Sequence, residues 1–211
     1  MRRKNETVEQ LKSMGLSMDL AFAAYGAFGH EAVEKLSIDP YQLIRESQDK
    51  IDWRELDRFA QTVGFQNSDL ARISAAILHR VRYASSDGHV FFPKIPLLTD
   101  SGQLLNIEEP AALQRGLDDL CQSGLLFRET APEGGADHGD WVYLMDLYQA
   151  ESSIAYYLGL MAHSPSTMRL HVPNDRDFAR IEKDLRISLA EAQREAIRLS
   201  LADKILVITG G

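Results

Sequence analysis

The 211-residue sequence has one cysteine, no long hydrophobic run and no excess of positive charge. A single cysteine, Cys121, excludes an internal disulfide and is typical of a protein kept in a reducing cytoplasm. No run of about 18 apolar residues occurs, so we expect no membrane-spanning helix and no membrane partner. The basic residues 1–5 are followed by no apolar signal-peptide segment. We therefore predict a cytoplasmic protein.

The net charge of −8 argues against a protein that binds nucleic acid with its whole surface. Residues 65–150 are the most acidic part, with 6 Lys and Arg against 12 Asp and Glu. Any DNA contact must therefore be local, and a broad contact in this middle part is least expected.

Catalytic and metal-binding patterns are also missing. The six histidines have neither the paired i, i+4 spacing nor the cysteine partners of a metal site. No spacing indicates a Ser-His-Asp triad or a pair of catalytic carboxylates. We predict no catalytic residue, no metal site and no cofactor for this chain by itself.

Short helices are expected over the first 64 residues. Ser17 is a candidate N-cap for a helix over Met18–Phe28, which Gly29 would end. Residues 40–64 predict two helices around a tight turn at 47–50, with Asp52 capping the second. Such a pair is a helix-hairpin-helix candidate, a module that offers backbone N–H groups to DNA phosphates. The alternative is an ordinary helical pair in a bundle.

A longer helix is expected over residues 69–83, with an apolar stripe at helical spacing. No acid lies between residues 72 and 83, and four basic side chains lie outside the apolar stripe. This face is either solvated or a phosphate-contacting surface. Its candidate DNA contacts are Arg72, His79, Arg80 and Arg82.

The next part changes character. Residues 89–93, 125–127 and 141–144 predict strands, and residues 111–122 predict a helix. Helix, helix and β-hairpin is the winged-helix order. The polar loop at 130–140 would form the wing, which carries three acids and no Lys or Arg. An architectural or protein-facing wing is therefore favoured over a DNA-binding one.

The C-terminal part predicts helices over 147–162 and Asp175–Leu185, separated by a Ser- and Pro-containing linker. A further helix-like segment carries Gln193 and leads to the apolar run 205–208, followed by Thr209-Gly210-Gly211. An apolar strand that runs into glycines is typical of the start of a phosphate-binding loop. The alternative is a terminal strand with a flexible glycine end.

Taken in order, these patterns resemble the long form of RecD-like ATP-dependent DNA helicases, which belong to superfamily 1. The resemblance covers nearly the whole chain. It is carried by Leu11-Lys-Ser-Met-Gly15-Leu-Ser, Tyr25-Gly-Ala-Phe-Gly29, Asp39-Pro40-Tyr41-x-Leu43, Asp57-Arg58-x-Ala60, Gly64, Arg72-Ile73-x-Ala75-Ala76-Ile77-Leu78, Asp87-Gly88-His89-Val90-x-x-Pro93, Leu189-x-x-x-Gln193-x-x-Ala196-Ile197 and KILVITGG.

The resemblance implies a piece that lies just before the motor of a 5′→3′ DNA helicase involved in repair or recombination. It implies that Gln193 reads the adenine edge of ATP, and that Gly210 and Gly211 match the first glycine of the Walker A motif and the residue after it. ATP and Mg²⁺ would serve the parent protein, an ATP hydrolase. No Gly-Lys-Thr occurs in the sequence, so we expect a fragment cut at both ends that is inactive alone.

One departure concerns the DNA grip. The family usually has a Gly-Ile-Gly-Phe hairpin where this chain reads Lys50-Ile51-Asp52-Trp53. Losing both glycines removes the close backbone approach to a phosphate, and Asp52 adds negative charge. We therefore rank the cationic helix above Lys50 and Arg54 as the place where single-stranded or junction DNA binds, weakly.

We predict a mainly α fold: a helix-hairpin-helix region at 1–66, a winged-helix-like region with a small β-hairpin at 67–150, and linker helices plus the first helix and strand of a RecA-like α/β motor at 151–211. The leading function is a DNA-guiding accessory region of an ATP-dependent helicase. The alternatives are a winged-helix DNA-binding regulator module and an adaptor that docks a protein, neither with a motor.

Overall fold

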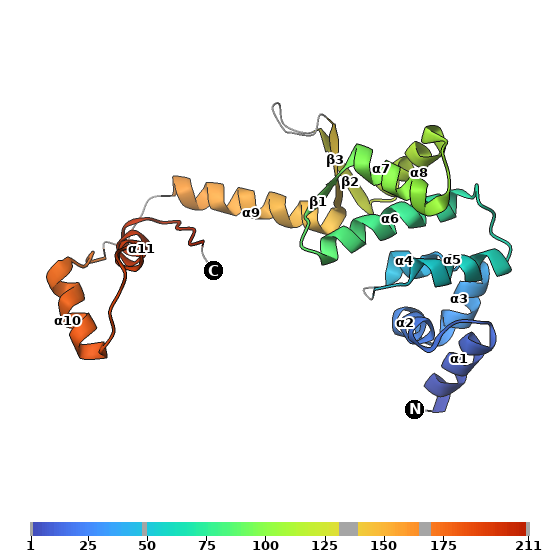
Figure 1. Ribbon diagram of the computed structural model, residues 1–211, viewed down its shortest axis with the longest axis horizontal. Coiled ribbons are helices and arrows are strands. Elements are labelled where there is room, and N and C mark those ends of the chain that lie inside the picture. Colours follow the sequence, from blue (N-terminus) through green and yellow to red (C-terminus); the bar gives the residue numbers. More distant parts are fainter. Residues whose placement is uncertain (1, 48–49, 131–138, 165–169, 210–211) are drawn as a thin grey trace. The chain divides into compact units, whose positions relative to one another are not determined.

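The computed structural model describes residues 2–47, 50–130, 139–164 and 170–209. Helices predominate, and one small antiparallel sheet accompanies them (Figure 1). The predicted mainly α class is confirmed. The chain divides into two compact units, Met1–Tyr148 and Gln149–Gly211, which are described separately below.

The first part of unit 1 is a set of short helices with local start and stop signals. Ser17 Oγ accepts the N–H of Leu20, and Gly29 follows the same helix with a φ of 59°. Asp52 caps the last of these helices by accepting the N–H of Glu55. All three predicted signals are confirmed. The elements are α1 (Arg2–Ser13), α2 (Met18–Phe28), η1 (Gly29–Glu31), α3 (Ala32–Ile38), α4 (Gln42–Glu46) and α5 (Trp53–Thr62).

The second part of unit 1 combines three helices with the sheet. Its elements are α6 (Leu70–Ser86), β1 (Phe91–Pro93), α7 (Lys94–Leu105), α8 (Pro110–Gln122), β2 (Leu126–Thr130) and β3 (Asp140–Leu144). The three strands lie where the sequence predicts them, in the order β1-β3-β2. Helix α7 was not predicted, because Pro96 in its first turn and Gly102 in its interior obscure the periodicity.

The two faces of the sheet differ because side chains alternate along a strand. Val142 and Leu126 are fully buried and belong to the core. The opposite face is aromatic: Tyr143 pairs with Phe91 of β1 and Phe127 of β2. The Phe91 ring stacks on Trp141, with 4.4 Å between ring centres.

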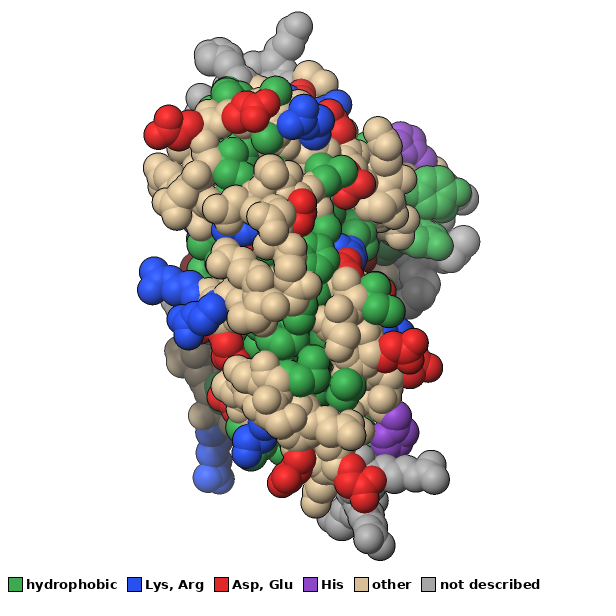
Figure 2. All heavy atoms as spheres, turned by 90° about the vertical axis from the view of Figure 1, so that its right-hand side faces the viewer, with side chains coloured by type: hydrophobic (Ala, Val, Ile, Leu, Met, Phe, Trp, Pro, Cys, Tyr) green, Lys and Arg blue, Asp and Glu red, His purple; other side chains and the backbone are tan. Residues whose placement is uncertain are grey.

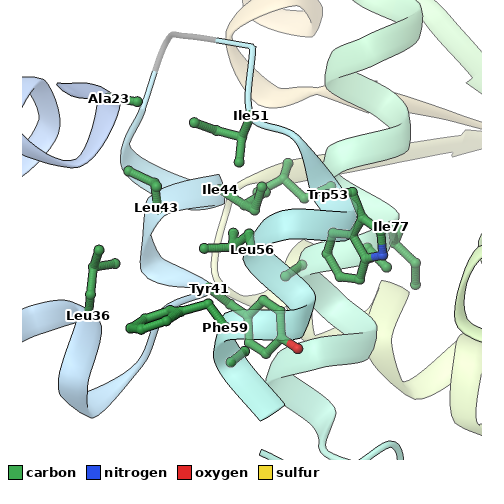
Figure 3. Packing of buried hydrophobic residues seen from close by; sticks show 14 of the residues in the cluster. Ala23, Leu36, Tyr41, Leu43, Ile44, Ile51, Trp53, Leu56, Phe59 and Ile77 are labelled. Carbon is green, nitrogen blue, oxygen red and sulfur yellow. The ribbon is translucent and has the colours of Figure 1, made fainter. Parts of the chain in front are cut away.

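Helix α6 lies at the centre of unit 1. It runs between α4 and α5 on one side and α7, α8 and the sheet on the other (Figure 1). Figure 3 shows Ile77 of α6 beside the apolar side chains of the α4–α5 pair, Trp53 among them. A single cluster of buried residues extends from Val8 to Val142. The predicted regions 1–66 and 67–150 therefore share one hydrophobic core.

Unit 2 contains most of α9 (Met145–His163), then α10 (Asp175–Leu185) and α11 (Glu191–Ala202). The helices predicted here are confirmed. Residues 205–208 form no strand, contrary to expectation, and Val207 and Ile208 are 78% and 72% exposed. A strand needs a neighbour to pair its backbone groups, and the described residues of unit 2 include no strand.

Candidate nucleic-acid interface

The hairpin formed by α4 and α5 is stabilised by aromatic packing between the residues that begin its two helices. Tyr41, just before α4, is fully buried. Its ring stacks on Trp53, the first residue of α5, with 5.7 Å between ring centres. Ile51 is also buried, and Figure 3 shows it near Leu43 and Ile44 of α4, with Trp53 beside Ile77 of α6. The side chains of Lys50, Asp52 and Arg54 are left exposed.

Three cations of the hairpin are exposed: Lys50, Arg54 and Arg58. Lys50 Nζ lies 5.8 Å from the centre of the Tyr83 ring. Within the described parts of the chain, none of the three forms an ion pair. They are therefore available to a phosphate.

Carboxylates already occupy the N-terminus of α5. Asp52 Oδ1 accepts the N–H of Glu55 at 3.0 Å. The Glu55 carboxylate in turn accepts the N–H and the hydroxyl of Ser17, at 2.6 and 2.8 Å. These two acids place negative charge where a glycine-containing hairpin would bring its backbone N–H groups close to a phosphate. Any contact here must therefore come from side chains.

Arg72 does not face solvent. Its side chain is 4% exposed and donates to both oxygens of Asp57, at 2.7 and 2.9 Å. The Tyr41 hydroxyl donates to Asp57 Oδ1 at 2.5 Å. Burial, followed by this carboxylate, raises the pKa of Tyr41 far above its usual value. Arg72 also reaches the carbonyls of Asn67 and Leu105, and thus ties α5 to the end of α7.

The other predicted DNA-contacting residues of α6 also have partners within the protein. Arg80 pairs with Asp100 of α7 at 2.8 Å. Arg82 donates to three backbone carbonyls at the end of α4. The His79 ring lies against Trp53, and burial lowers the pKa of His79.

The expectation of a free cationic face on α6 is therefore wrong. Opposing acids are absent from the helix itself, but α5 and α7 supply them from 15 and 20 residues away. Arg72 is among the nine buried residues of this central helix. Figure 2 shows small groups of Lys and Arg interspersed with Asp and Glu on the face it presents, rather than one large basic patch.

Sequence reasoning missed Asp57 as the partner of Arg72. A signal was available, because Trp53, Leu56, Asp57 and Ala60 share one face of α5 and the other three are buried. An acid in such a row predicts a buried cation opposite it, since a buried charge needs a partner.

The candidate adenine reader, Gln193, lies in the first turn of α11. Its Oε1 accepts the N–H of Ala190 at 2.9 Å. This bond orients the amide and uses one of the two lone pairs of the oxygen. The second lone pair and the NH₂ group match one donor and one acceptor on adenine, so the residue fits that role. Gly210 and Gly211 lie outside the described residues.

Neither a metal site nor a membrane span emerges from the part of the chain that the structure describes. It contains no group of three or more His, Cys, Asp or Glu residues placed to hold a metal ion. No described helix is both long and apolar enough to cross a membrane.

A comparison with known protein families finds a match for the first part of the chain. Residues 1–91 match the family model described as "ATP-dependent RecD2 DNA helicase HHH domain". The match contains α1 to α6 and extends to the first residue of β1. It therefore includes the α4–α5 hairpin and the helix that supports it. Residues 1–91 are thus similar to the helix-hairpin-helix domain in the N-terminal region of RecD2-like DNA helicases.

Proposed function

We propose that this chain is the DNA-guiding accessory region of an ATP-dependent 5′→3′ DNA helicase that acts in DNA repair or recombination. The observation that carries the proposal is the family match over residues 1–91, which contains a well-packed α4–α5 hairpin with exposed cations. Helix-hairpin-helix modules bind DNA through its phosphates and without sequence preference.

Within this proposal, Lys50 and Arg54 are the DNA contacts. This reverses the prediction from the sequence, which ranked the arginines of α6 above them. Both are exposed at or just after the turn, whereas Arg72, Arg80 and Arg82 are committed to protein partners. Only a few phosphates would be neutralised, and Asp52 and Glu55 lie nearby. Binding is therefore weak, in the range of about micromolar or poorer at physiological salt.

Fluorescence anisotropy with a labelled single-stranded oligonucleotide tests this site. Replacing both Lys50 and Arg54 with Ala should weaken binding and flatten the plot of log K against log salt by about 1.4, which is about 0.7 for each lost phosphate contact. Lys12→Ala is the control, since Lys12 is an exposed cation on α1 that forms no ion pair within the described residues. An unchanged affinity in the double variant, or an equal loss in the control, would contradict the proposal.

The region α6 to β3 is proposed to be a winged-helix-like support rather than a second DNA site. The element order and the central position of β3 favour a winged helix. The cations beside its hairpin are paired with acids: Arg128 lies within ion-pair distance of Asp118 and Asp140, and Lys94 lies 3.6 Å from Asp140. Such pairing leaves little charge for phosphates.

ATP and Mg²⁺ are proposed as ligands of the complete motor, with Gln193 holding the adenine. In a protein that includes the motor, Gln193→Glu keeps the oxygen that accepts the Ala190 N–H but loses the NH₂ donor. The substitution should therefore weaken the binding of ATP more than the binding of GTP, because the donor and acceptor on the guanine edge are exchanged relative to adenine. Calorimetry measures both affinities. Equal loss for both nucleotides would indicate a structural role.

The chain as given has no P-loop lysine, and we expect no micromolar ATP binding from it.

A protein-docking adaptor is the second candidate, and helix α9 favours it. Its second half carries no charge between Ser152 and Ala162. Six large apolar side chains there are 41–63% exposed: Ile154, Tyr156, Tyr157, Leu158, Leu160 and Met161. An adaptor of this kind would show no salt-dependent DNA binding in the anisotropy titration.

A further inference from the structure

Arg82 makes an unusual set of contacts for a cation that is partly withdrawn from solvent. One terminal nitrogen donates to the carbonyls of Ile44 and Ser47, and the other donates to the carbonyl of Arg45 at 2.9 Å. The Ser47 bond is 2.6 Å long. All three acceptors lie in the last turn of α4 or directly after it, where the chain leaves the helix for the turn.

These contacts are made to the main chain and not to an acid. Among the described residues, no carboxylate lies within ion-pair distance of Arg82. Burial lowers the pKa of Arg82, and the more distant charges of Asp146 and Glu46 only partly offset this. Withdrawing a guanidinium from water is costly without a partner. Its contacts must therefore compensate, and here they fix backbone carbonyls that the end of a helix leaves unsatisfied.

A second anchor on the same helix holds the other half of the hairpin. Arg72 donates hydrogen bonds to Asp57 of α5, while Arg82 donates hydrogen bonds to carbonyls at the end of α4. Ten residues separate the two arginines, or about 15 Å along the helix. Helix α6 thus contacts both arms of the hairpin through side chains that the sequence alone suggested as DNA contacts.

We propose that Arg82 is a positioning residue that fixes the end of α4 within the α4–α5 hairpin, which presents Lys50 and Arg54 to DNA, without touching DNA itself. This inference rests on the proposed function of the hairpin. The guanidinium fork is what suits the role, since two nitrogens in one plane reach three carbonyls at once. A lysine ammonium carries the same charge but lacks that planar fork.

The experiment compares Arg82→Lys and Arg82→Ala in the full chain, with Arg80→Lys and Arg80→Ala as matched controls. Arg80 lies on the same helix but pairs with Asp100. Two readouts are taken. The first is ¹⁹F NMR without DNA on protein labelled with 5-fluorotryptophan. Trp53 is the first residue of α5, Trp141 is the internal reference, and Trp141→Phe assigns the two signals. The second readout is the affinity for the single-stranded oligonucleotide at several salt concentrations.

We expect both Arg82 variants to shift the Trp53 signal, leave the Trp141 signal in place and weaken DNA binding by about tenfold, the size of one lost charged hydrogen bond. The salt slope should stay unchanged, because the same phosphates are contacted. The Arg82→Lys variant is measured first, because it is the milder change and keeps the positive charge.

Two results would overturn the positioning role. One is an Arg82→Lys protein with wild-type affinity and an unmoved Trp53 signal, which would show that charge suffices. The other is a salt slope flattened by about 0.7 in Arg82→Ala with an unmoved Trp53 signal, which indicates a direct phosphate contact. If the Trp53 signal shifts while substitutions of Arg82 and of the Lys50 and Arg54 pair leave DNA affinity unchanged, the positioning of the end of α4 stands and the DNA role of the hairpin fails.

Discussion

The Asp57–Arg72 pair shows how a single buried ion pair fixes the arrangement of several elements. The Arg72 guanidinium contacts Asp57 and two carbonyls, and Asp57 also accepts the Tyr41 hydroxyl. Replacing Asp57 with Ala leaves a buried guanidinium without its counter-charge. The expected loss is about 3–5 kcal/mol in the free energy of unfolding, measured by urea denaturation.

Asp100→Ala is the comparison for Asp57→Ala. It removes the partner of Arg80, but both members of that pair are about one-third exposed. Solvent screens such a pair, so its loss should cost about 1 kcal/mol or less. Equal losses in the two variants would show that burial of the Asp57–Arg72 pair does not set its contribution.

His79 predicts a pH dependence of stability. Burial lowers its pKa in the folded protein, so protons bind more readily to the unfolded chain. A histidine whose pKa is lower in the folded protein stabilises the fold at pH values above its pKa in the unfolded chain, which is about 6.5. This stabilisation is lost as the pH falls through the pKa of the folded protein. The free energy of unfolding should therefore fall between pH 7 and pH 5, and less steeply in His79→Gln. His89→Gln is the control at an exposed position, and an identical slope for the wild type and His79→Gln would contradict the prediction.

At the scale of elements, α6 and α8 approach closely at Gly116. A Cβ built there would lie 2.6 Å from Cγ2 of Ile73 and 3.1 Å from Cδ1 of Ile77. Gly116→Ala should therefore destabilise unit 1 by about 1–3 kcal/mol through overpacking, although Ala is the better helix former. Thermal unfolding measures this loss.

Gly159→Ala is the matched control for Gly116→Ala. Gly159 lies inside α9, and a Cβ there meets nothing within 4 Å. The substitution should raise the helix content or stability by up to about 1 kcal/mol. Destabilisation by both substitutions would mean that close approach is not the cause at Gly116.

Elements with local signals could be predicted from the sequence, and those that depend on distant residues could not. The helices Met18–Phe28 and Asp175–Leu185 have the predicted bounds because polar N-caps mark their starts. Residues 205–208 have a strand-like composition, but a strand also requires a neighbour. The roles of the α6 arginines were missed because their acceptors lie on other helices, up to 38 residues away.

At the scale of the whole molecule, the two units differ in what holds them together. Unit 1 contains nearly all the buried hydrophobic residues, whereas Phe178 is the one fully buried apolar side chain in the described part of unit 2. Arg194 and Arg198 lie over its ring, at 5.8 and 5.0 Å from the ring centre. Both also form ion pairs that join α10 to α11: Arg194 with Glu182, and Arg198 with Asp175.

This difference predicts that unit 2 opens far more readily than unit 1 in the full chain. Hydrogen exchange followed by mass spectrometry should show strong protection in α6 and α8, whose packed faces exchange only when the core opens. Helices α10 and α11 should exchange quickly, because so little apolar surface is buried there. Raising salt from about 0.1 to 1 M shortens the screening length from about 10 to 3 Å. It should therefore speed exchange in α10 and α11 while leaving α6 unchanged. Equal protection in both units, or exchange in α10 and α11 that is insensitive to salt, would show that unit 2 is held by contacts other than these ion pairs.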